Sequence, residues 1–297
     1  MLLTGATGFI GSRLLEAFVN AGHEVVAVKR STSNPWRIAH LLDRVQTVDA
    51  DRFSPAEILA THPGIETVLH TVTTYSRDGK LSECVETNVL WPMRLLEALK
   101  PGSTFINTDS CFTKDRSYIY LQGYTHTKAH LVELARSMLE KSDIAFVNMK
   151  LEHPYGTMDS PWKFMTSIVR QCLQNIPKLD LTEGLQAKDF VYLKDVVGAY
   201  LKVFESGLPT PGHFKEYEVG TGEPNTIRTV VSRIHAISGS RTELRFGALP
   251  YRKNEIMRSQ ADMSALRAIG FQNQWSLDAG LSEVIESERQ ALKAEAK

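Results

Sequence analysis

Short apolar runs alternate with longer segments of helical periodicity over the first 150 residues of the chain. Each apolar run is rich in β-branched and aromatic residues and has the length of a buried strand. These runs are Leu2–Leu3, His23–Val28, Val45–Val48, Thr67–Val72, Thr104–Asn107 and Ala145–Lys150. The helical segments are Gly11–Ala21, Ser82–Leu99 and Gly123–Lys141. This alternation predicts an α/β fold, a doubly wound parallel sheet of the Rossmann type with helices on both faces.

The texture of the chain changes after residue 151, where Pro and Gly interrupt most segments, as in Pro154-Tyr155-Gly156. Such a pattern predicts a smaller, irregular C-terminal lobe, which we expect to bind the substrate. The segment 187–205 has the pattern of a strand followed by a helix, and we expect it to return to the first domain. The expected domains are therefore a dinucleotide-binding domain at 1–151, joined by 187–205, and a substrate-binding lobe at 152–186 and 206–297.

Charge and cysteine content narrow the range of partners and compartments. The 34 basic and 34 acidic residues give a net charge of zero, which argues against nucleic acid or an anionic membrane as a partner. No apolar run approaches the ~20 residues that a membrane-spanning helix needs. The three cysteines, Cys84, Cys111 and Cys172, are isolated and form no C-x-x-C pair. We therefore expect a reduced, cytoplasmic protein and no metal site.

A glycine fingerprint lies at the start of the chain, where Gly5, Gly8 and Gly11 follow the first apolar run with the spacing G-x-x-G-x-x-G. Glycines permit a tight turn and let the backbone approach a diphosphate closely. The next helix begins near Phe9 and presents free N–H groups and the positive end of its dipole. The strand–turn–helix context makes this a prediction of dinucleotide binding rather than of an incidental turn.

The end of the second predicted strand indicates which nicotinamide cofactor is bound. NAD enzymes usually carry an acid here, which binds the ribose 2′-hydroxyl, but this chain has Lys29 and Arg30. Both side chains would attract a 2′-phosphate, which favours NADP(H) over NAD(H). Asp51, after the third strand, is placed to reach the adenine amino group, although a simple turn carboxylate is nearly as good an interpretation.

Tyr124 and Lys128 are the candidate catalytic pair, because residues four apart on a helix point the same way. A free tyrosine titrates near ~10, and we expect the neighbouring ammonium to lower that pKa so that the phenol can exchange a proton. A hydroxyl at the end of the preceding strand completes the set. Ser110 is the first choice to bind the reacting carbonyl, and Thr108 is the alternative.

These features resemble the extended short-chain dehydrogenase/reductase family, which comprises nucleotide-sugar epimerases, dehydratases and reductases. The resemblance covers nearly the whole chain. Within the family, the chain is similar to the bacterial 4-ketoreductases that make the dideoxysugars of O-antigens. The segments that carry the likeness are Val68–Thr71, Glu86–Asn88, Ile106–Ser110, Phe146–His153, Tyr155-Gly156, Lys163-Phe164, Lys188–Val196, Glu218–Gly222 and Arg252–Met257.

The resemblance implies further site residues, a homodimer and a nucleotide-sugar substrate. Asn88 would support the Lys128 side of a proton relay, and His153 lies where most relatives use Asn against the substrate. The implied cofactor contacts are Gly5, Thr7, Gly8, Phe9, Ile10, Lys29, Arg30, Asp51, Thr71, Val72, Asn88, Lys128 and Leu151. The implied substrate contacts are Tyr75, Thr108, His153, Lys163 and Arg252, of which Lys163 and Arg252 are candidates for the diphosphate.

The expected activity is NADPH-dependent reduction of a nucleotide-linked 4-keto-6-deoxy sugar, with hydride delivered to C4 and Tyr124 as the proton donor. A 4,6-dehydratase is disfavoured, because Ser110 stands where the resemblance requires a Glu base. An epimerase with retained NAD uses the same Tyr and Lys and stays open as an alternative. A catalytically silent nucleotide-binding regulator is the alternative from another class.

Overall fold

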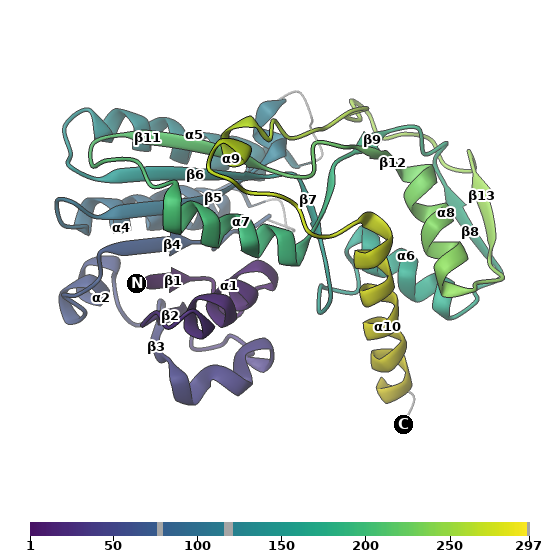
Figure 1. The fold of residues 1–297 in the computed structure, drawn as a ribbon, viewed down its shortest axis with the longest axis horizontal. Coiled ribbons are helices and arrows are strands. Elements are labelled where there is room, and N and C mark those ends of the chain that lie inside the picture. Colours follow the sequence, from purple (N-terminus) through teal and green to yellow (C-terminus); the bar gives the residue numbers. More distant parts are fainter. Residues whose placement is uncertain (76–79, 116–120, 296–297) are drawn as a thin grey trace. The chain divides into compact units, whose positions relative to one another are not determined.

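The computed structural model describes residues 1–75, 80–115 and 121–295, which form two compact units (Figure 1). The first unit contains 1–151, 197–218 and 264–271, and the second contains 152–196, 219–263 and 272–297. The segment 187–205 is divided, since only its residues from 197 onward belong to the first unit. Residues 206–218 and 264–271, which we expected in the C-terminal lobe, also belong to the first unit.

A seven-stranded sheet forms the centre of the first unit, in the order β11-β6-β5-β4-β1-β2-β3 (Figure 1). The neighbouring pairs from β3 to β6 are all parallel, and this part has the strand order of a Rossmann sheet. The expected doubly wound fold is confirmed. The strands are β1 (Leu2–Thr4), β2 (Val26–Lys29), β3 (Gln46–Asp49), β4 (Thr67–His70), β5 (Thr104–Ser110), β6 (Ala145–Leu151) and β11 (Phe214–Val219).

Helices cover both faces of this sheet (Figure 1). On one face, apolar side chains of α2, α4 and α5 pack in a single cluster on Val68, Phe105 and Phe146 of the strands. On the other face lie α1 and α7, where the rings of Phe18 and Phe204 meet edge to face at 5.2 Å. The helices are α1 (Phe9–Asn20), α2 (Pro55–Thr61), α3 (Leu81–Val85), α4 (Trp91–Ala98), α5 (Gln122–Leu139), α7 (Leu193–Ser206) and α9 (Ser264–Ala268). Shorter 3₁₀ or π-helical segments are Trp36–Arg44, Glu86–Leu90 and Cys111–Lys114.

The second unit packs three helices against short paired strands. Its core joins α6, α8 and α10 through buried side chains such as Val169, Val231 and Leu281. The helices are α6 (Phe164–Leu173), α8 (Ile227–Ser238) and α10 (Leu277–Glu295). The strands are β7 (His153–Tyr155), β8 (Lys178–Leu181), β9 (Ala187–Lys188), β10 (Phe190–Tyr192), β12 (Asn225–Thr226) and β13 (Glu243–Phe246).

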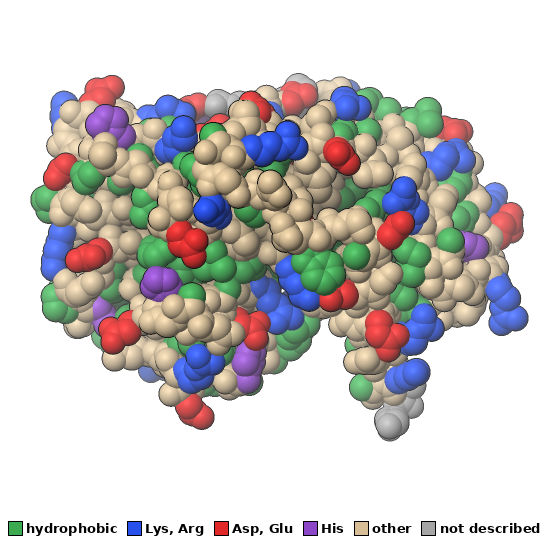
Figure 2. All heavy atoms as spheres, viewed as in Figure 1, with side chains coloured by type: hydrophobic (Ala, Val, Ile, Leu, Met, Phe, Trp, Pro, Cys, Tyr) green, Lys and Arg blue, Asp and Glu red, His purple; other side chains and the backbone are tan. Residues whose placement is uncertain are grey.

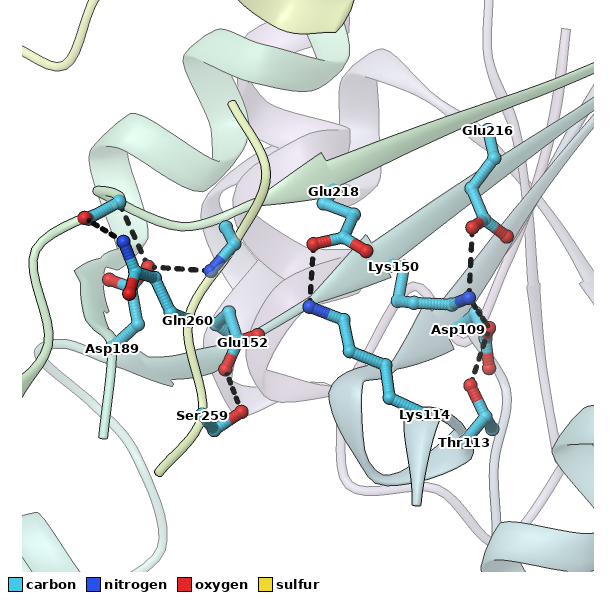
Figure 3. Close-up of polar contacts among 12 residues, drawn as sticks. Asp109, Thr113, Lys114, Lys150, Glu152, Asp189, Glu216, Glu218, Ser259 and Gln260 are labelled. Atoms are coloured by element: carbon cyan, nitrogen blue, oxygen red, sulfur yellow. Dashed lines mark hydrogen bonds and ion pairs between the residues drawn. The ribbon is translucent and has the colours of Figure 1, made fainter. Parts of the chain in front are cut away.

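Asp189 ties together three segments of the second unit (Figure 3). Its carboxylate accepts hydrogen bonds from the backbone N–H groups of Thr221, Gly222 and Ala261 at 2.8, 2.9 and 3.1 Å. The Thr221 hydroxyl donates to it as well, at 2.6 Å. A fully buried carboxylate is tolerated only with such a set of donors. This bonding gives a physical reason for the Lys-Asp-Phe-Val and Gly-Thr-Gly motifs.

Acidic and basic side chains are interspersed on the face drawn in Figure 2, in agreement with the balanced composition. Among the helices of the described residues, none combines the length and the apolar character that crossing a membrane requires.

Candidate active site

The glycine turn after β1 has a backbone that only glycine can follow without rearrangement. Gly5 has φ +71°, in the left-handed region that disfavours a side chain. A Cβ atom on Gly11 would lie 2.1 Å from the Gly5 carbonyl oxygen, so the first turn of α1 presses directly on the loop. The N–H of Gly8 closes the turn by donating to the Gly5 carbonyl at 2.9 Å. The expected tight turn is therefore present at these glycines.

The N-terminus of α1 directly follows the glycine turn. Gly8 is the N-cap and supplies no side-chain cap, and the first turn of α1 contains no acidic residue. Its backbone N–H groups and the positive end of the helix dipole therefore have no competing internal carboxylate. Thr71, at the end of β4, donates its hydroxyl to the Thr4 carbonyl at 2.7 Å and supports the turn from the other side. The donor set and the close backbone fit a diphosphate.

Lys29 and Asp51 make contacts that the sequence did not reveal. The Lys29 ammonium pairs with Asp49 of β3 at 2.5 Å, because the parallel register places these two residues side by side. Lys29 is therefore not the free cation that we expected for a 2′-phosphate. The carboxylate of Asp51 accepts hydrogen bonds from the backbone N–H and the hydroxyl of Ser31, which lowers the pKa of Asp51. In this structure Asp51 thus holds the loop after β2.

Two arginines remain as cations beside the cofactor turn. Arg30 is exposed directly after β2. Arg37, which the sequence analysis missed, donates to the carbonyl of Thr7 within the glycine loop at 3.3 Å. Its guanidinium also lies 4.4 Å from the centre of the Trp36 ring. In the sequence, the only feature that pointed to Arg37 was its position as a basic residue a few places after the second predicted strand.

Tyr124, Lys128 and Ser110 come together as expected. Tyr124 and Lys128 are buried one turn apart on α5, and Ser110 ends β5. The hydroxyl of Ser110 is hydrogen-bonded to that of Tyr124. The alternative residue, Thr108, instead bonds the hydroxyl of Tyr200 on α7 at 2.7 Å. The geometry therefore favours Ser110 over Thr108 as the hydroxyl that works with Tyr124.

Two further contacts complete the surroundings of this pair. The ammonium of Lys128 donates to the backbone carbonyl of Thr108 at 2.9 Å. The ring of Tyr75 lies 4.7 Å from that of Tyr124, measured between ring centres. Tyr75, which we expected to face the sugar, therefore lies against the candidate catalytic phenol.

The pKa values of this pair differ from the expectation in one respect. Burial raises the pKa of Tyr124 well above its ordinary value, the neighbouring Tyr75 adds to the rise, and the bond with Ser110 partly opposes it. The expected lowering of this pKa is wrong for this structure, because desolvation of the buried phenol raises it. Burial lowers the pKa of Lys128 to about 8, while the charge of Asp109 opposes that change. Tyr124 is therefore a protonated phenol, which is the form that a proton donor needs.

Asn88 lies in a π-helical turn between α3 and α4, a distortion that is frequent at functional sites. Its side-chain oxygen accepts from the N–H of Thr74 at 2.9 Å, and its amide donates to the carbonyl of Thr74 and the hydroxyl of Thr127, each at 3.0 Å. These bonds join the segment after β4 to the second turn of α5. Asn88 thus supports the helix that carries Tyr124 and Lys128 through Thr127.

The remaining candidates for substrate contact belong to the second unit. His153 begins β7, and its ring nitrogen lies 3.5 Å from the buried carboxylate of Glu152, which in turn accepts from the Ser259 hydroxyl at 2.5 Å (Figure 3). Lys163 is the N-cap residue of α6, beside the free N–H groups of that helix. Arg252 lies exposed in the segment that precedes α9.

Comparison with known proteins gives the family. The model described as "NAD dependent epimerase/dehydratase family" matches residues 1–220. CDP-abequose synthase of Salmonella muenchen is 33% identical over 290 residues, which cover 96% of each chain. The enzyme of that name from Salmonella typhimurium is 33% identical over 293 residues, covering 96% of this chain and 97% of the relative. The expected resemblance, which pointed within the 4-ketoreductases to CDP-abequose and CDP-paratose synthases, is thereby confirmed for the first of these.

Solved structures agree with the fold. UDP-glucose 4-epimerase of Thermotoga maritima has a TM-score of 0.84 at 20% identity, covering 98% of this chain and 99% of the other. UDP-glucuronic acid 4-epimerase of Bacillus cereus, solved with UDP-glucuronic acid and NAD, has a TM-score of 0.82 at 23% identity, with the same coverage. At these identities the likeness shows the shared architecture. The match to the family model and the identity to the two Salmonella relatives show that the chain belongs to the NAD-dependent epimerase/dehydratase family.

Proposed function

We propose that the protein is an NADPH-dependent 4-ketoreductase of a nucleotide-linked 4-keto-6-deoxy sugar, similar in activity to CDP-abequose synthase. The observation that carries the proposal is the buried Tyr124 beside the side chain of Ser110, with Lys128 buried one helical turn away. Identity of 33% to CDP-abequose synthases over 96% of the chain supports the choice of substrate class.

Each residue of the site has a proposed task. Tyr124 donates its proton to the C4 oxygen as negative charge develops there, and Ser110 holds that oxygen by a hydrogen bond. Lys128 holds the nicotinamide ribose, and its positive charge favours the phenolate that remains on Tyr124. Bound NADPH would supply the hydride for the reduction at C4.

The cofactor would be held by the first unit. The N–H groups of the glycine turn, including those of Phe9 and Ile10, suit its diphosphate. Arg30 and Arg37 are the proposed partners of the 2′-phosphate, because an arginine offers a planar, bidentate match to phosphate oxygens. Because Lys29 is paired with Asp49, we assign the preference for NADPH to these two arginines instead.

The substrate would contact the second unit. His153, Lys163 and Arg252 are the proposed partners of the sugar and its diphosphate, and Lys163 combines its charge with the N-terminus of α6. We further infer a homodimer, because Val85, Leu90 and Leu134 are large apolar side chains exposed on contacting helical segments of the first unit. Sedimentation equilibrium would measure the number of subunits.

The test is incubation of the purified protein with NADPH and CDP-, dTDP- and UDP-linked 4-keto-6-deoxy sugars. We expect loss of absorbance at 340 nm with one of them, and an NMR spectrum of the product that shows a C4 hydroxyl. An epimerase would leave these ketones and NADPH unconsumed, and would instead interconvert the C4 epimers of a nucleotide sugar that carries a C4 hydroxyl. A regulator would bind NADPH without turnover with any of the three sugars, and either result would contradict the proposal.

A further inference from the structure

Asp109 is a buried carboxylate directly beside the candidate catalytic hydroxyl. It precedes Ser110 on β5, and only 3% of its surface is exposed. One of its oxygens, Oδ2, accepts from the hydroxyl of Thr113 at 3.1 Å (Figure 3). The same oxygen accepts from the amide of Asn148 at 3.0 Å. The other oxygen, Oδ1, has no side-chain donor within the described residues, while the backbone N–H of Ser110 also stabilises the carboxylate. The side-chain donors are therefore gathered on one oxygen.

The nearest cation is shared with a second carboxylate (Figure 3). Lys150 of β6 binds Glu216 of β11 at 2.9 Å and lies 3.9 Å from Asp109. Glu216 also accepts the amide of Asn148 at 2.8 Å, and these contacts lower the pKa of Glu216 against the effect of its burial. Lys150 therefore lies farther from Asp109 than from Glu216, and burial raises the pKa of Asp109.

Two routes connect Asp109 to the candidate catalytic groups. The first is structural, because the Thr113 hydroxyl lies within hydrogen-bond distance of both Asp109 and the backbone carbonyl of Ser110, at 3.1 and 2.8 Å, and shares its one proton between them. The second is electrostatic, because the negative charge of Asp109 raises the pKa values of both Tyr124 and Lys128. The charged or titratable groups that face Asp109 are Lys150 on β6, Glu216 on β11, Tyr124 and Lys128 on α5, and Tyr200 on α7.

We propose that Asp109 is a positioning residue for the reductase site, holding the turn that carries Ser110 and keeping Lys128 in its charged form. The inference rests on the proposed function and assigns the site an electrostatic support that acts from the neighbouring position on β5. The negative charge of Asp109 is present above its own pKa and is lost as the pH falls through that value. At higher pH it extends the range over which Lys128 stays protonated.

The test compares two variants that separate charge from geometry. Asp109→Asn keeps an oxygen for Thr113 and Asn148 but removes the charge. Thr113→Val removes the hydroxyl that joins Asp109 to Ser110 and leaves the charge in place. The measurements are the pH profile of kcat and the titration of Lys128 by ¹³C NMR of labelled lysine, with the resonance assigned from Lys128→Arg.

In the wild type we expect Lys128 to titrate at about 8, with kcat falling above that pH. Asp109→Asn should move both the titration and this limb to lower pH by about one unit, because the supporting negative charge is gone. At pH 8 a shift of one unit lowers the protonated fraction from a half to about a tenth, roughly a fivefold loss in kcat. The two profiles should converge toward pH 6. Thr113→Val should instead lower kcat by one factor at every pH and leave the Lys128 titration unchanged.

A uniform loss of kcat in Asp109→Asn, with the Lys128 titration unmoved, would overturn the proposal and leave Asp109 a packing residue. If the amide variant does not fold by circular dichroism, Asp109→Ser, a smaller neutral side chain, repeats both measurements. The NMR titration needs no turnover. Absence of reductase activity in the wild type therefore refutes the proposed function, while the titration still decides the electrostatic role.

Discussion

Replacement of Gly11 by Ala tests the cofactor site at its tightest contact. The new Cβ would lie 2.1 Å from the carbonyl oxygen of Gly5 and 2.8 Å from Oγ1 of Thr71. The first obstacle is backbone and not the end of a flexible side chain. Since a Cβ atom essentially never lies within 3.0 Å of a non-bonded heavy atom, the helix and the glycine turn must separate by roughly 1 Å. That movement displaces the N–H groups proposed for the diphosphate.

The size of the effect follows from the packing. Overpacking a close contact costs about 1–3 kcal/mol, and in a protein of this size each kcal/mol lowers Tm by about 2–4 °C. We therefore expect Gly11→Ala to melt between about 2 and 12 °C below the wild type. NADPH at a hundred times its Kd should stabilise the wild type by about 2.7 kcal/mol, and the variant should lose most of this gain.

Gly64→Ala is the matched control, because a Cβ atom there meets nothing within 4 Å and the backbone is not left-handed. The assay is thermal unfolding with and without NADPH, together with a fluorescence titration of NADPH. Gly64→Ala should behave as the wild type in both. Undiminished stabilisation of Gly11→Ala by NADPH would show that the cofactor does not use this turn.

Three further predictions test the other parts of the proposed site. Tyr124→Phe should keep NADPH binding and lose turnover by ~10²–10⁴-fold, since the ring still packs while the proton donor is gone; near-native kcat would remove Tyr124 from its role. Arg30→Ala combined with Arg37→Ala should raise the KM for NADPH at least about tenfold and leave the KM for NADH unchanged. Each lost charge-assisted bond is worth ~1.5–3 kcal/mol. Equal effects on both cofactors would refute recognition of the 2′-phosphate. Arg252→Ala should raise the KM for the sugar nucleotide by about one to two decades without affecting NADPH affinity, and unaltered saturation by the sugar nucleotide would make Arg252 a surface residue.

Most of the fold could be predicted because its signals are local. Each strand from β1 to β6 lies in a short apolar run, and helical periodicity predicted α1, α5 and the helical stretch that contains α3 and α4, although it missed α2. The strand at the sheet edge was harder to place. Phe214–Val219 contains Lys215, Glu216 and Glu218 and does not look like a buried strand. Its two acids are balanced by Lys150 and Lys114, which lie far away in sequence. The membership of this strand in the sheet therefore depends on pairing that no local pattern contains.

The candidate site likewise contains features that the local sequence predicts and features that it does not. Spacing of four on one helix was enough to bring Tyr124 and Lys128 together, and a strand end was enough to place Ser110. The pairing of Lys29 with Asp49 could not be seen, because it depends on the register between two strands. The raised pKa of Tyr124 could not be seen either, since the motif contains the neighbouring ammonium but not the depth of burial.

That raised pKa bears on the choice between reductase and epimerase. A ketoreductase needs a phenol that holds its proton until an alkoxide develops, and burial of Tyr124 favours this form. An epimerase begins by removing a proton from the C4 hydroxyl, which requires a phenolate that is readily formed. In this structure Lys128 donates to the carbonyl of Thr108, and the charge of Asp109 disfavours the phenolate further. The electrostatics around Tyr124 thus keep the phenol protonated before reaction, which is the starting state of the proposed reduction.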